Sequence, residues 1–100
     1  MKAQIFNYRF WIKETTPNFI HQKLRIILSD SGFKILQSIE HYFDPYGYTA
    51  LFLLGESHLA IHTFPEENKS YIELSSCNAN YFNIFKKTIR SDSEITVLEK

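Results

Sequence analysis

The sequence predicts an α+β domain, a two-layer α/β sandwich in which two helices lie on one face of a mainly antiparallel sheet. Three observations support this fold class. Apolar segments with a period of two alternate with two helical segments, in the order strand, helix, strands, helix, strand. Phe, Tyr and Trp make up 16% of the residues, and these side chains pack well on sheets. At 100 residues, the chain is expected to form a single domain, residues 1–100.

The N-terminal third contains a strand and a helix. Residues 3–13 alternate apolar and polar side chains, which predicts the first strand. Thr16 and Pro17 predict a helix start, with Thr at the N-cap and Pro at the first helical position. Gly32 is suited to end this helix in the left-handed conformation. The apolar stripe between these ends consists of Ile20, Leu24, Ile27 and Leu28.

A hairpin is predicted next. Residues 44–47 read Asp-Pro-Tyr-Gly, a turn sequence in which Pro presets φ and Gly tolerates a positive φ. The turn leads into a third strand, residues 48–54, which is apolar on both faces and is therefore expected to be buried on both. Helices cover one face, and a second copy of the protein is the expected cover for the other. The side chains expected on one side of the second strand are Phe33, Ile35, Ile39 and Phe43.

The remaining elements follow the same reasoning. Gly55-Glu56 interrupts the third strand, and Asn78 or Asn80 is expected to cap a second helix. The apolar side chains of that helix recur at helical spacing, at Phe82, Phe85 and Ile89. The other predicted strands cover residues 59–63, 70–77 and 94–98.

Composition narrows the class of function. The chain has 11 Lys and Arg and 11 Asp and Glu, so its net charge of zero argues against a nucleic-acid-binding module. No apolar run approaches the ~20 residues that span a bilayer, so no membrane association is expected. The first 12 residues lack the apolar core of a signal peptide, and one cysteine cannot form an intrachain disulfide. A cytoplasmic location is the expectation.

The segment around Ser57 has the groups needed for self-cleavage. By itself, Ser57 is most simply a turn residue, but Glu56 precedes it and His58 and His62 follow it. A serine hydroxyl that attacks the preceding carbonyl forms an ester. A base that removes the serine α-proton then leaves dehydroalanine, which hydrolyses to a pyruvoyl group. Histidine is the natural base at neutral pH, and Gly55 offers the freedom that a strained turn needs.

The histidines and the cysteine allow other interpretations. His58 and His62 share a parity, so they are expected on one side of a strand, most simply as a hydrogen-bonded pair. A zinc site that adds Cys77 and His41 is a weaker alternative, because the ligand spacing is poor, and no metal is predicted. Cys77 is either a small buried residue or, beside a helix N-terminus, a thiol of lowered pKa that acts as proton donor or nucleophile.

Two phenylalanines flank the hairpin region. As core residues, Phe43 and Phe64 need no further role. As a pair around a cleft, they would stack on a flat ligand and attract a cation over their faces. The residue pattern leaves both interpretations open.

The segment Tyr48–Glu66 resembles the processing segment of the bacterial S-adenosylmethionine decarboxylases. It contains Glu-Ser-His followed by His-Thr-aromatic-Pro-Glu, with His62 five residues and Cys77 20 residues after Ser57. The resemblance is strong over residues 43–77. Thr49 stands where the family carries a serine, Asn78 replaces a glycine, and the chain is shorter than most members.

The resemblance implies a proenzyme that cuts itself between Glu56 and Ser57, giving a β chain of residues 1–56 and an α chain of residues 57–100. Ser57 would become the pyruvoyl cofactor, which forms a Schiff base with the substrate amine. His62 would be the processing base, and the Thr49 hydroxyl would assist it.

The resemblance also implies roles in turnover. Cys77 would be the proton donor, Phe43 and Phe64 would hold the adenine of S-adenosylmethionine, and Glu66 would bind the ribose hydroxyls. The family fold is a sandwich that forms a homodimer of four layers, αββα, with active sites at the interface. This agrees with the doubly apolar third strand.

The predicted function is therefore decarboxylation of S-adenosylmethionine for spermidine, and so polyamine, biosynthesis. A pyruvoyl-dependent arginine or ornithine decarboxylase is one alternative. Another is a non-processing homologue that serves as a binding or regulatory subunit, although the presence of Ser57, His62 and Cys77 together argues against it.

Overall fold

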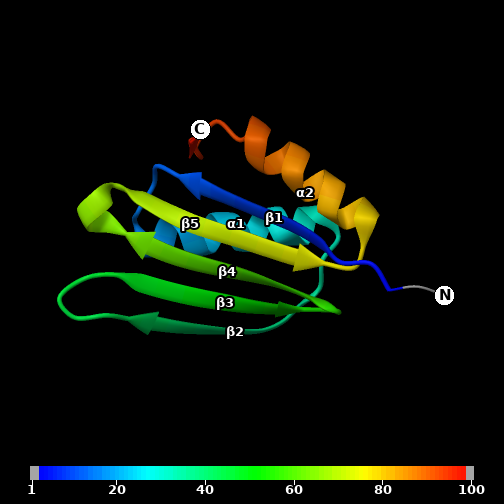
Figure 1. Ribbon diagram of the computed structural model, residues 1–100, viewed down its shortest axis with the longest axis horizontal. Helices are drawn as coiled ribbons and strands as arrows, with labels where there is room; N and C mark the ends of the chain where they lie inside the picture. The colour runs from blue at the N-terminus through cyan, green and yellow to red at the C-terminus, as the bar shows by residue number, and fades with distance from the viewer. Residues whose placement is uncertain (1–2, 99–100) are drawn as a thin grey trace.

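The computed structural model describes residues 3–98 and confirms the α+β class (Figure 1). Six strands form one sheet in the order β2-β3-β4-β5-β1-β6, and every pair of neighbours is antiparallel. A 3-10 turn, η1, separates β4 from β5. The elements are β1 (Phe6–Ile12), α1 (Pro17–Ser31), β2 (Ile35–Tyr42), β3 (Tyr48–Leu54), β4 (Ser57–Phe64), η1 (Pro65–Glu67), β5 (Lys69–Ser76), α2 (Ala79–Ser91) and β6 (Val97–Leu98).

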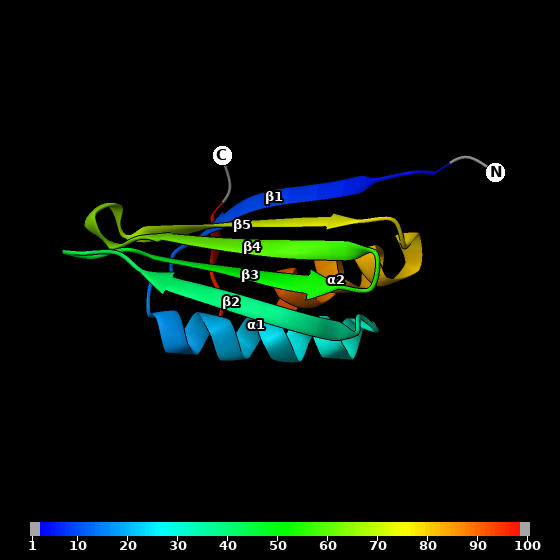
Figure 2. The ribbon, with the colours of Figure 1, turned by 90° about the horizontal axis from the view of Figure 1, so that it is seen from below.

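Both helices lie on the same face of the sheet, as predicted (Figure 2). The hydrophobic core fills the space between the two helices and the sheet. It includes Leu24, Phe52, Ile61, Ile72 and Phe85, each fully buried. Burying these side chains is the main term that stabilises the two layers. Within residues 3–98, neither helix has the length and apolar character needed to cross a membrane.

The helix ends follow local sequence signals. Thr16 holds the N-cap position of α1, as predicted, in an extended conformation, and its hydroxyl caps no backbone N–H. Gly32 ends α1 with a φ of 113°, and a Cβ there would meet the Tyr81 ring at 2.6 Å. Asn78 caps α2, because its side chain accepts a hydrogen bond from the Tyr81 N–H at 2.9 Å.

Strand β2 differs from the prediction that Phe33, Ile35, Ile39 and Phe43 share one side. Ile35 faces the helices, but the register shifts between Ile35 and Gln37. The extra residue of this bulge moves the following side chains to the opposite face, so Ile39 pairs with Leu51 and is 66% exposed. A bulge depends on the partner strand, and for this reason the period of β2 alone did not predict it.

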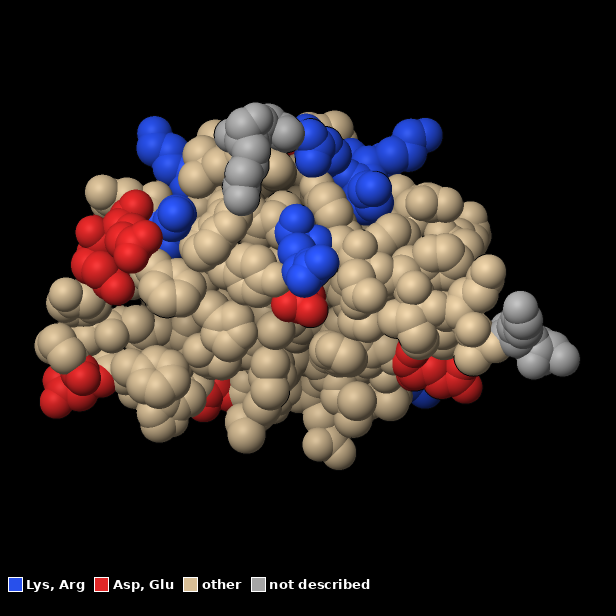
Figure 3. All heavy atoms as spheres, viewed as in Figure 1, with Lys and Arg blue, Asp and Glu red and all other residues tan. Residues whose placement is uncertain are grey.

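The second face of the sheet carries no helix, and we call it the open face. It is turned toward the viewer in Figures 1 and 3, where uncharged side chains cover much of the β2-β3-β4 half. Leu51 and Leu53 are 45% and 48% exposed there, and with Ile39 and His58 they line a groove of about 300 Å³. The prediction that helices cover one face of β3 is confirmed, whereas a second copy on the other face stays a prediction.

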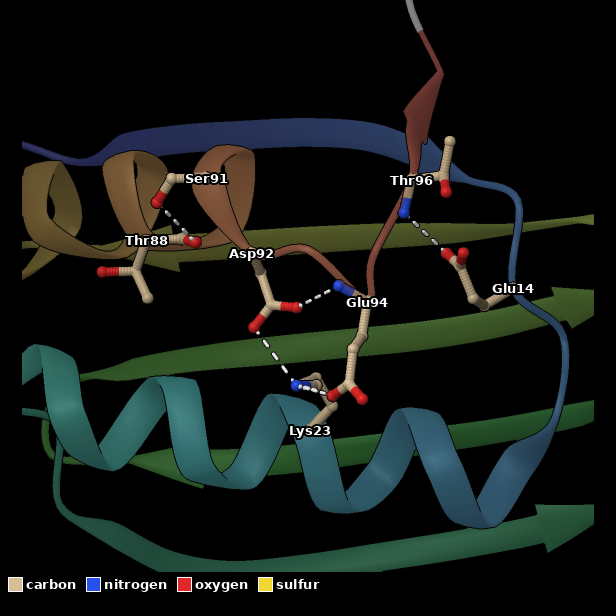
Figure 4. Close-up of polar contacts among 7 residues, drawn as sticks. All are labelled: Glu14, Lys23, Thr88, Ser91, Asp92, Glu94 and Thr96. Atoms are coloured by element: carbon tan, nitrogen blue, oxygen red, sulfur yellow. Dashed lines mark hydrogen bonds and ion pairs between the residues drawn. The ribbon is translucent and has the colours of Figure 1, made fainter.

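A polar cluster ties α1 to the chain that follows α2 (Figure 4). Lys23 on α1 forms ion pairs with Asp92 and Glu94, and Asp92 accepts a hydrogen bond from the Glu94 N–H. Glu14 accepts a hydrogen bond from the Thr96 N–H at 2.9 Å. These contacts fix the C-terminal segment beside β1, where β6 then pairs with Trp11 and Ile12.

Candidate functional site

Strand β4 carries candidate groups at both of its ends. Ser57 is the first residue of β4, not part of a loop, and it pairs with Leu54 and Ser76. His62 lies five residues further on, which is roughly 16 Å along a strand. An odd separation also places the two side chains on opposite faces, with Ser57 toward the helices and His62 on the open face. The structure therefore does not bring Ser57 and His62 together within one chain.

The two groups of residues form what we call the serine end and the histidine end. The serine end consists of Glu56, Ser57, Ser76 and Cys77. The histidine end consists of Phe43, Thr49, His62, Phe64 and Glu66. The residues predicted from the sequence thus separate into two sets.

At the serine end, backbone strain lies at Glu56. This residue has a φ of 56°, in the left-handed region that costs about 1–2 kcal/mol for a residue other than glycine. Gly55 has no positive φ, so the prediction that Gly55 provides the strained position is wrong. The strain falls on the residue whose carbonyl would be attacked.

The Cys77 thiol lies against the same carbonyl. Its Sγ donates to the Glu56 backbone oxygen at 3.3 Å and lies 3.5 Å from Glu56 Oε1. Burial of the thiol raises its pKa, and the hydrogen bond and charge of the Glu56 carboxylate raise it further. The interpretation of Cys77 as a thiol of lowered pKa is therefore wrong. A protonated thiol suits a proton donor better than a nucleophile.

The Ser57 hydroxyl is buried, with 7% of the residue exposed, and it donates to Ser76 Oγ at 3.0 Å. Ser76 also accepts a hydrogen bond from the Asn78 N–H at 3.0 Å. Sequence reasoning missed Ser76, because only the register of β4 against β5 places it opposite Ser57. Its signal in the sequence was a hydroxyl directly before Cys77, at the end of a strand.

The histidine end is centred on a hydroxyl–imidazole pair. Thr49 Oγ1 lies 2.9 Å from His62 Nδ1, and the two residues are direct partners across β3 and β4. A hydrogen bond at Nδ1 fixes the ring and leaves Nε2 available for proton transfer. The structure thus brings together the two residues to which the resemblance assigned a shared role.

A small cavity adjoins this pair. Phe43, Phe64 and Glu66 line it together with Thr49 and His62, and its volume is about 180 Å³. Two aromatic rings and a carboxylate around one cavity suit a flat ligand with hydroxyl or cationic groups. The Phe43 side chain is 51% exposed, so the cavity is open to solvent on that side.

The zinc alternative gains no support. Among residues 3–98, no group of three His, Cys, Asp or Glu side chains lies close enough to hold a metal ion. His58 and His62 do share the open face, as predicted, but His58 lines the apolar groove with Leu51 and Leu53. Cys77 lies at the serine end, at the other end of β4 from His62.

The fold and these clusters define the class first: a two-layer α+β domain whose polar groups gather at both ends of one sheet strand. Comparison with known proteins then gives the family. The family model for S-adenosylmethionine decarboxylase matches residues 13–94. The chain belongs to the S-adenosylmethionine decarboxylase family.

Individual relatives agree with this assignment. A Bacillus cereus S-adenosylmethionine decarboxylase proenzyme is 42% identical over 60 residues, covering 60% of this chain and 49% of the relative. A Thermotoga petrophila proenzyme is 34% identical over 86 residues, covering 79% and 66%. The chain spans about half the length, or less, of the first curated relatives that it matches.

A solved structure supports the fold independently. The crystal structure of the adenosylmethionine decarboxylase from Aquifex aeolicus has a TM-score of 0.69 against this chain, and the match covers 98% of this chain and 89% of the other. The sequence identity is 16%, so this likeness concerns the fold alone.

Proposed function

We propose that this chain is a self-processing S-adenosylmethionine decarboxylase that cuts itself between Glu56 and Ser57. The observation that carries the proposal is the contact of the Cys77 thiol with the Glu56 carbonyl oxygen, at a residue with a left-handed φ. The carbonyl of the bond that would be cut thus accepts a hydrogen bond, and it belongs to a residue with a strained backbone conformation. The product of the decarboxylation, decarboxylated S-adenosylmethionine, would supply the aminopropyl group for spermidine synthesis in the cytoplasm.

The first step uses groups of the serine end. Ser57 Oγ attacks the Glu56 carbonyl carbon, a C–O bond replaces the C–N bond, and the hydroxyl proton moves to the Ser57 nitrogen. Negative charge develops on the Glu56 oxygen during the attack. The Cys77 S–H, 3.3 Å from that oxygen, stabilises the charge by donating a hydrogen bond.

The second step needs a base. Removal of the Ser57 α-proton breaks the Cβ–Oγ bond, releases Glu56 as a carboxylate and leaves dehydroalanine. Water then replaces the nitrogen, which leaves as ammonia, and a pyruvoyl group remains at the head of residues 57–100. The pyruvoyl group needs only a serine at the first position of the new chain. Ser57 meets this requirement.

His62 is the proposed base, and it must come from a second copy of the chain. Within one chain, His62 lies on the opposite face and roughly 16 Å along the strand from Ser57. The exposed Ile39, Leu51 and Leu53 of the open face are suited to pack against the same side chains of a partner. An antiparallel, two-fold arrangement would set each serine end against the partner's histidine end.

Thr49 has a supporting role in this arrangement. Its hydroxyl holds the His62 ring through Nδ1, which leaves Nε2 to take the Ser57 α-proton of the partner chain. Threonine keeps the hydroxyl that the family's serine provides, which is why the substitution is compatible with processing.

Turnover would use both ends of the site. Once formed at Ser57, the pyruvoyl group would supply an electron sink for the decarboxylation. Cys77, held protonated by burial and by Glu56, would return a proton to the product carbon. Phe43 and Phe64 would stack on the adenine, while the Glu66 carboxylate would accept hydrogen bonds from the ribose hydroxyls.

Intact mass under denaturing conditions tests the proposal. The wild-type protein should give two fragments, residues 1–56 and a pyruvoyl-blocked 57–100, whereas Ser57→Ala should remain one chain. Release of carbon dioxide from carboxyl-labelled S-adenosylmethionine, arginine and ornithine then identifies the substrate. An uncut wild-type chain after long incubation would support the non-processing homologue, and carbon dioxide from arginine or ornithine alone would identify the other decarboxylase.

A further inference from the structure

A second hydroxyl contacts the proposed nucleophile. Ser76 Oγ accepts the hydrogen bond of the Ser57 hydroxyl at 3.0 Å, and Ser76 is 1% exposed. We infer that Ser76 positions the Ser57 hydroxyl for self-cleavage. The inference rests on the proposed function, and it adds a residue that neither the motif nor the resemblance assigned.

Ser76 is itself held on three sides. It is the last residue of β5, where it pairs with Ser57 on one side and Phe6 on the other. Its Oγ accepts the Asn78 N–H at 3.0 Å and lies 3.4 Å from the Asn78 carbonyl oxygen. Asn78 is the N-cap of α2, so the second helix and the sheet together fix the position of the Ser76 oxygen.

A fixed acceptor restricts where the nucleophile points. A serine side chain has three staggered rotamers, and an unrestrained hydroxyl divides its time among them. The hydrogen bond to Ser76 selects one rotamer, so the Ser57 oxygen is held in one position. Intramolecular attack gains from such alignment, because the reacting atoms need no further ordering.

Ser76 suits both stages of the reaction. Before attack, its oxygen accepts the Ser57 proton in a hydrogen bond and leaves the Ser57 lone pairs free. After attack, the Ser57 oxygen has become an ester oxygen without a proton. The Ser76 hydroxyl can then turn and donate to it, which favours breaking the Cβ–Oγ bond as the Glu56 carboxylate leaves.

Ser76 differs from the other buried serine of β5 in its partner. Ser70 also faces the helices, but its hydroxyl donates to the Glu14 carbonyl oxygen at 2.7 Å, and the residues between the two serines on this face, Ile72 and Leu74, are apolar. A buried hydroxyl costs free energy unless it forms hydrogen bonds. The bond to the Asn78 N–H gives Ser76 a structural reason to be present, so the test must separate that role from the contact with Ser57.

The experiment follows the appearance of residues 57–100 by intact mass after the full-length protein is expressed and purified rapidly. Ser76→Ala should slow cleavage about tenfold, as expected for one hydrogen bond to the reacting atom. Ser76→Thr keeps the hydroxyl and should restore most of the rate. Hydroxylamine cleaves esters but not peptide bonds. It therefore reports whether the slow variant accumulates as the uncut peptide or as the ester intermediate.

Two matched controls isolate the contact. Ser75→Ala removes the neighbouring hydroxyl, which faces the opposite side of β5, and should cleave at the wild-type rate. Asn78→Ala removes the α2 cap without removing either hydroxyl. Asn78→Ala should lower the thermal midpoint as much as Ser76→Ala does, yet cleave faster than Ser76→Ala.

The outcomes separate the two proposals. A wild-type chain that stays intact overturns the proposed function itself. A wild-type chain that cleaves, with Ser76→Ala cleaving equally fast, overturns only the role of Ser76. Equal slowing in Ser76→Ala and Asn78→Ala, with no restoration by Ser76→Thr, shows that the residue only supports the start of α2.

Discussion

The serine end and the histidine end of β4 are built in different ways. At the serine end the reacting groups belong partly to the backbone, at a left-handed Glu56, and the side chains around it are buried or half-buried. At the histidine end the groups are side chains on the open face, around a cavity that is exposed to solvent. The serine end is suited to cleavage of the chain itself, and the histidine end is suited to binding a ligand.

This difference explains why neither end is complete. The serine end has the proposed nucleophile and proton donor, but not the proposed base, because its own histidine, His58, faces the apolar groove. The histidine end has an imidazole and aromatic rings, but lacks a bond to cut. A single antiparallel sheet strand cannot bring its own two ends together, because its backbone is extended. The proposed symmetric pair of chains would resolve this, since each histidine end would then meet the other chain's serine end.

The strongest test of this division mixes two inactive variants. Ser57→Ala and His62→Ala should each remain uncut when expressed alone. In a mixed dimer, the His62→Ala chain keeps Ser57 and faces a partner with an intact His62, so that chain alone should be cut. Intact mass of the co-expressed, differently tagged chains measures this. Cleavage of His62→Ala by itself would mean that another base acts, and no cleavage in the verified mixture would disprove the two-chain site.

The next test removes the surface that would join the chains. Leu53 is 48% exposed on the open face, and Leu53→Asp would place a charge in the middle of the proposed interface. Burial of an unpaired carboxylate is costly, so we expect monomers and cleavage slowed by about a hundredfold. Ile26→Asp is the control, because Ile26 is 54% exposed on α1. Light scattering and intact mass should both distinguish the two variants, and a monomer that cleaves normally would contradict the proposal.

A smaller effect is expected from the thiol. Cys77→Ala removes the donor on the Glu56 oxygen, so cleavage should slow by about 10- to 100-fold without stopping. Decarboxylation by the cleaved fraction should fall further, because the proton donor is also lost. Since burial and Glu56 raise the thiol pKa, the wild-type rate should hold into alkaline pH, where an unshifted thiol would ionise. A rate that falls at or below neutral pH as this thiol ionises would contradict the raised pKa.

Much of the fold was predictable from local signals. The Asp-Pro-Tyr-Gly turn and the Gly32 and Asn78 ends of the helices each have a cause within a few residues. The bulge in β2 and the start of β4 at Ser57 were not predictable, because they depend on which residues of other strands lie opposite.

The site was only partly predictable for the same reason. The motif named Ser57, His62, Cys77 and Thr49, and the structure brings Thr49 to His62 and Cys77 to Glu56. Closeness in sequence was misleading for Ser57 and His62, because five residues in a strand span a long distance. Ser76 needed the register between β4 and β5, and the Cys77 pKa needed the carboxylate beside it.

The smallest expected effect lies away from both ends of β4. Lys23 pairs with Asp92 and Glu94 and joins α1 to the segment after α2 (Figure 4). Its pKa is raised, mainly by the hydrogen bond to Glu94. A raised pKa means that the folded state favours the charged lysine, so the stabilisation is complete below the unfolded pKa of about 10.4 and is lost as pH rises through the folded value.

Lys23→Met should therefore lower the thermal midpoint slightly at neutral pH, because exposed ion pairs stabilise weakly. The difference from wild type should shrink above about pH 10, as the lysine loses its proton. Cleavage should be unchanged, because these contacts support the far end of α2 and not Asn78. A pH-independent difference would indicate that the aliphatic stem of Lys23, not its charge, makes the contribution. Slowed cleavage would mean instead that the serine end depends on the whole of α2, and not only on its first turn.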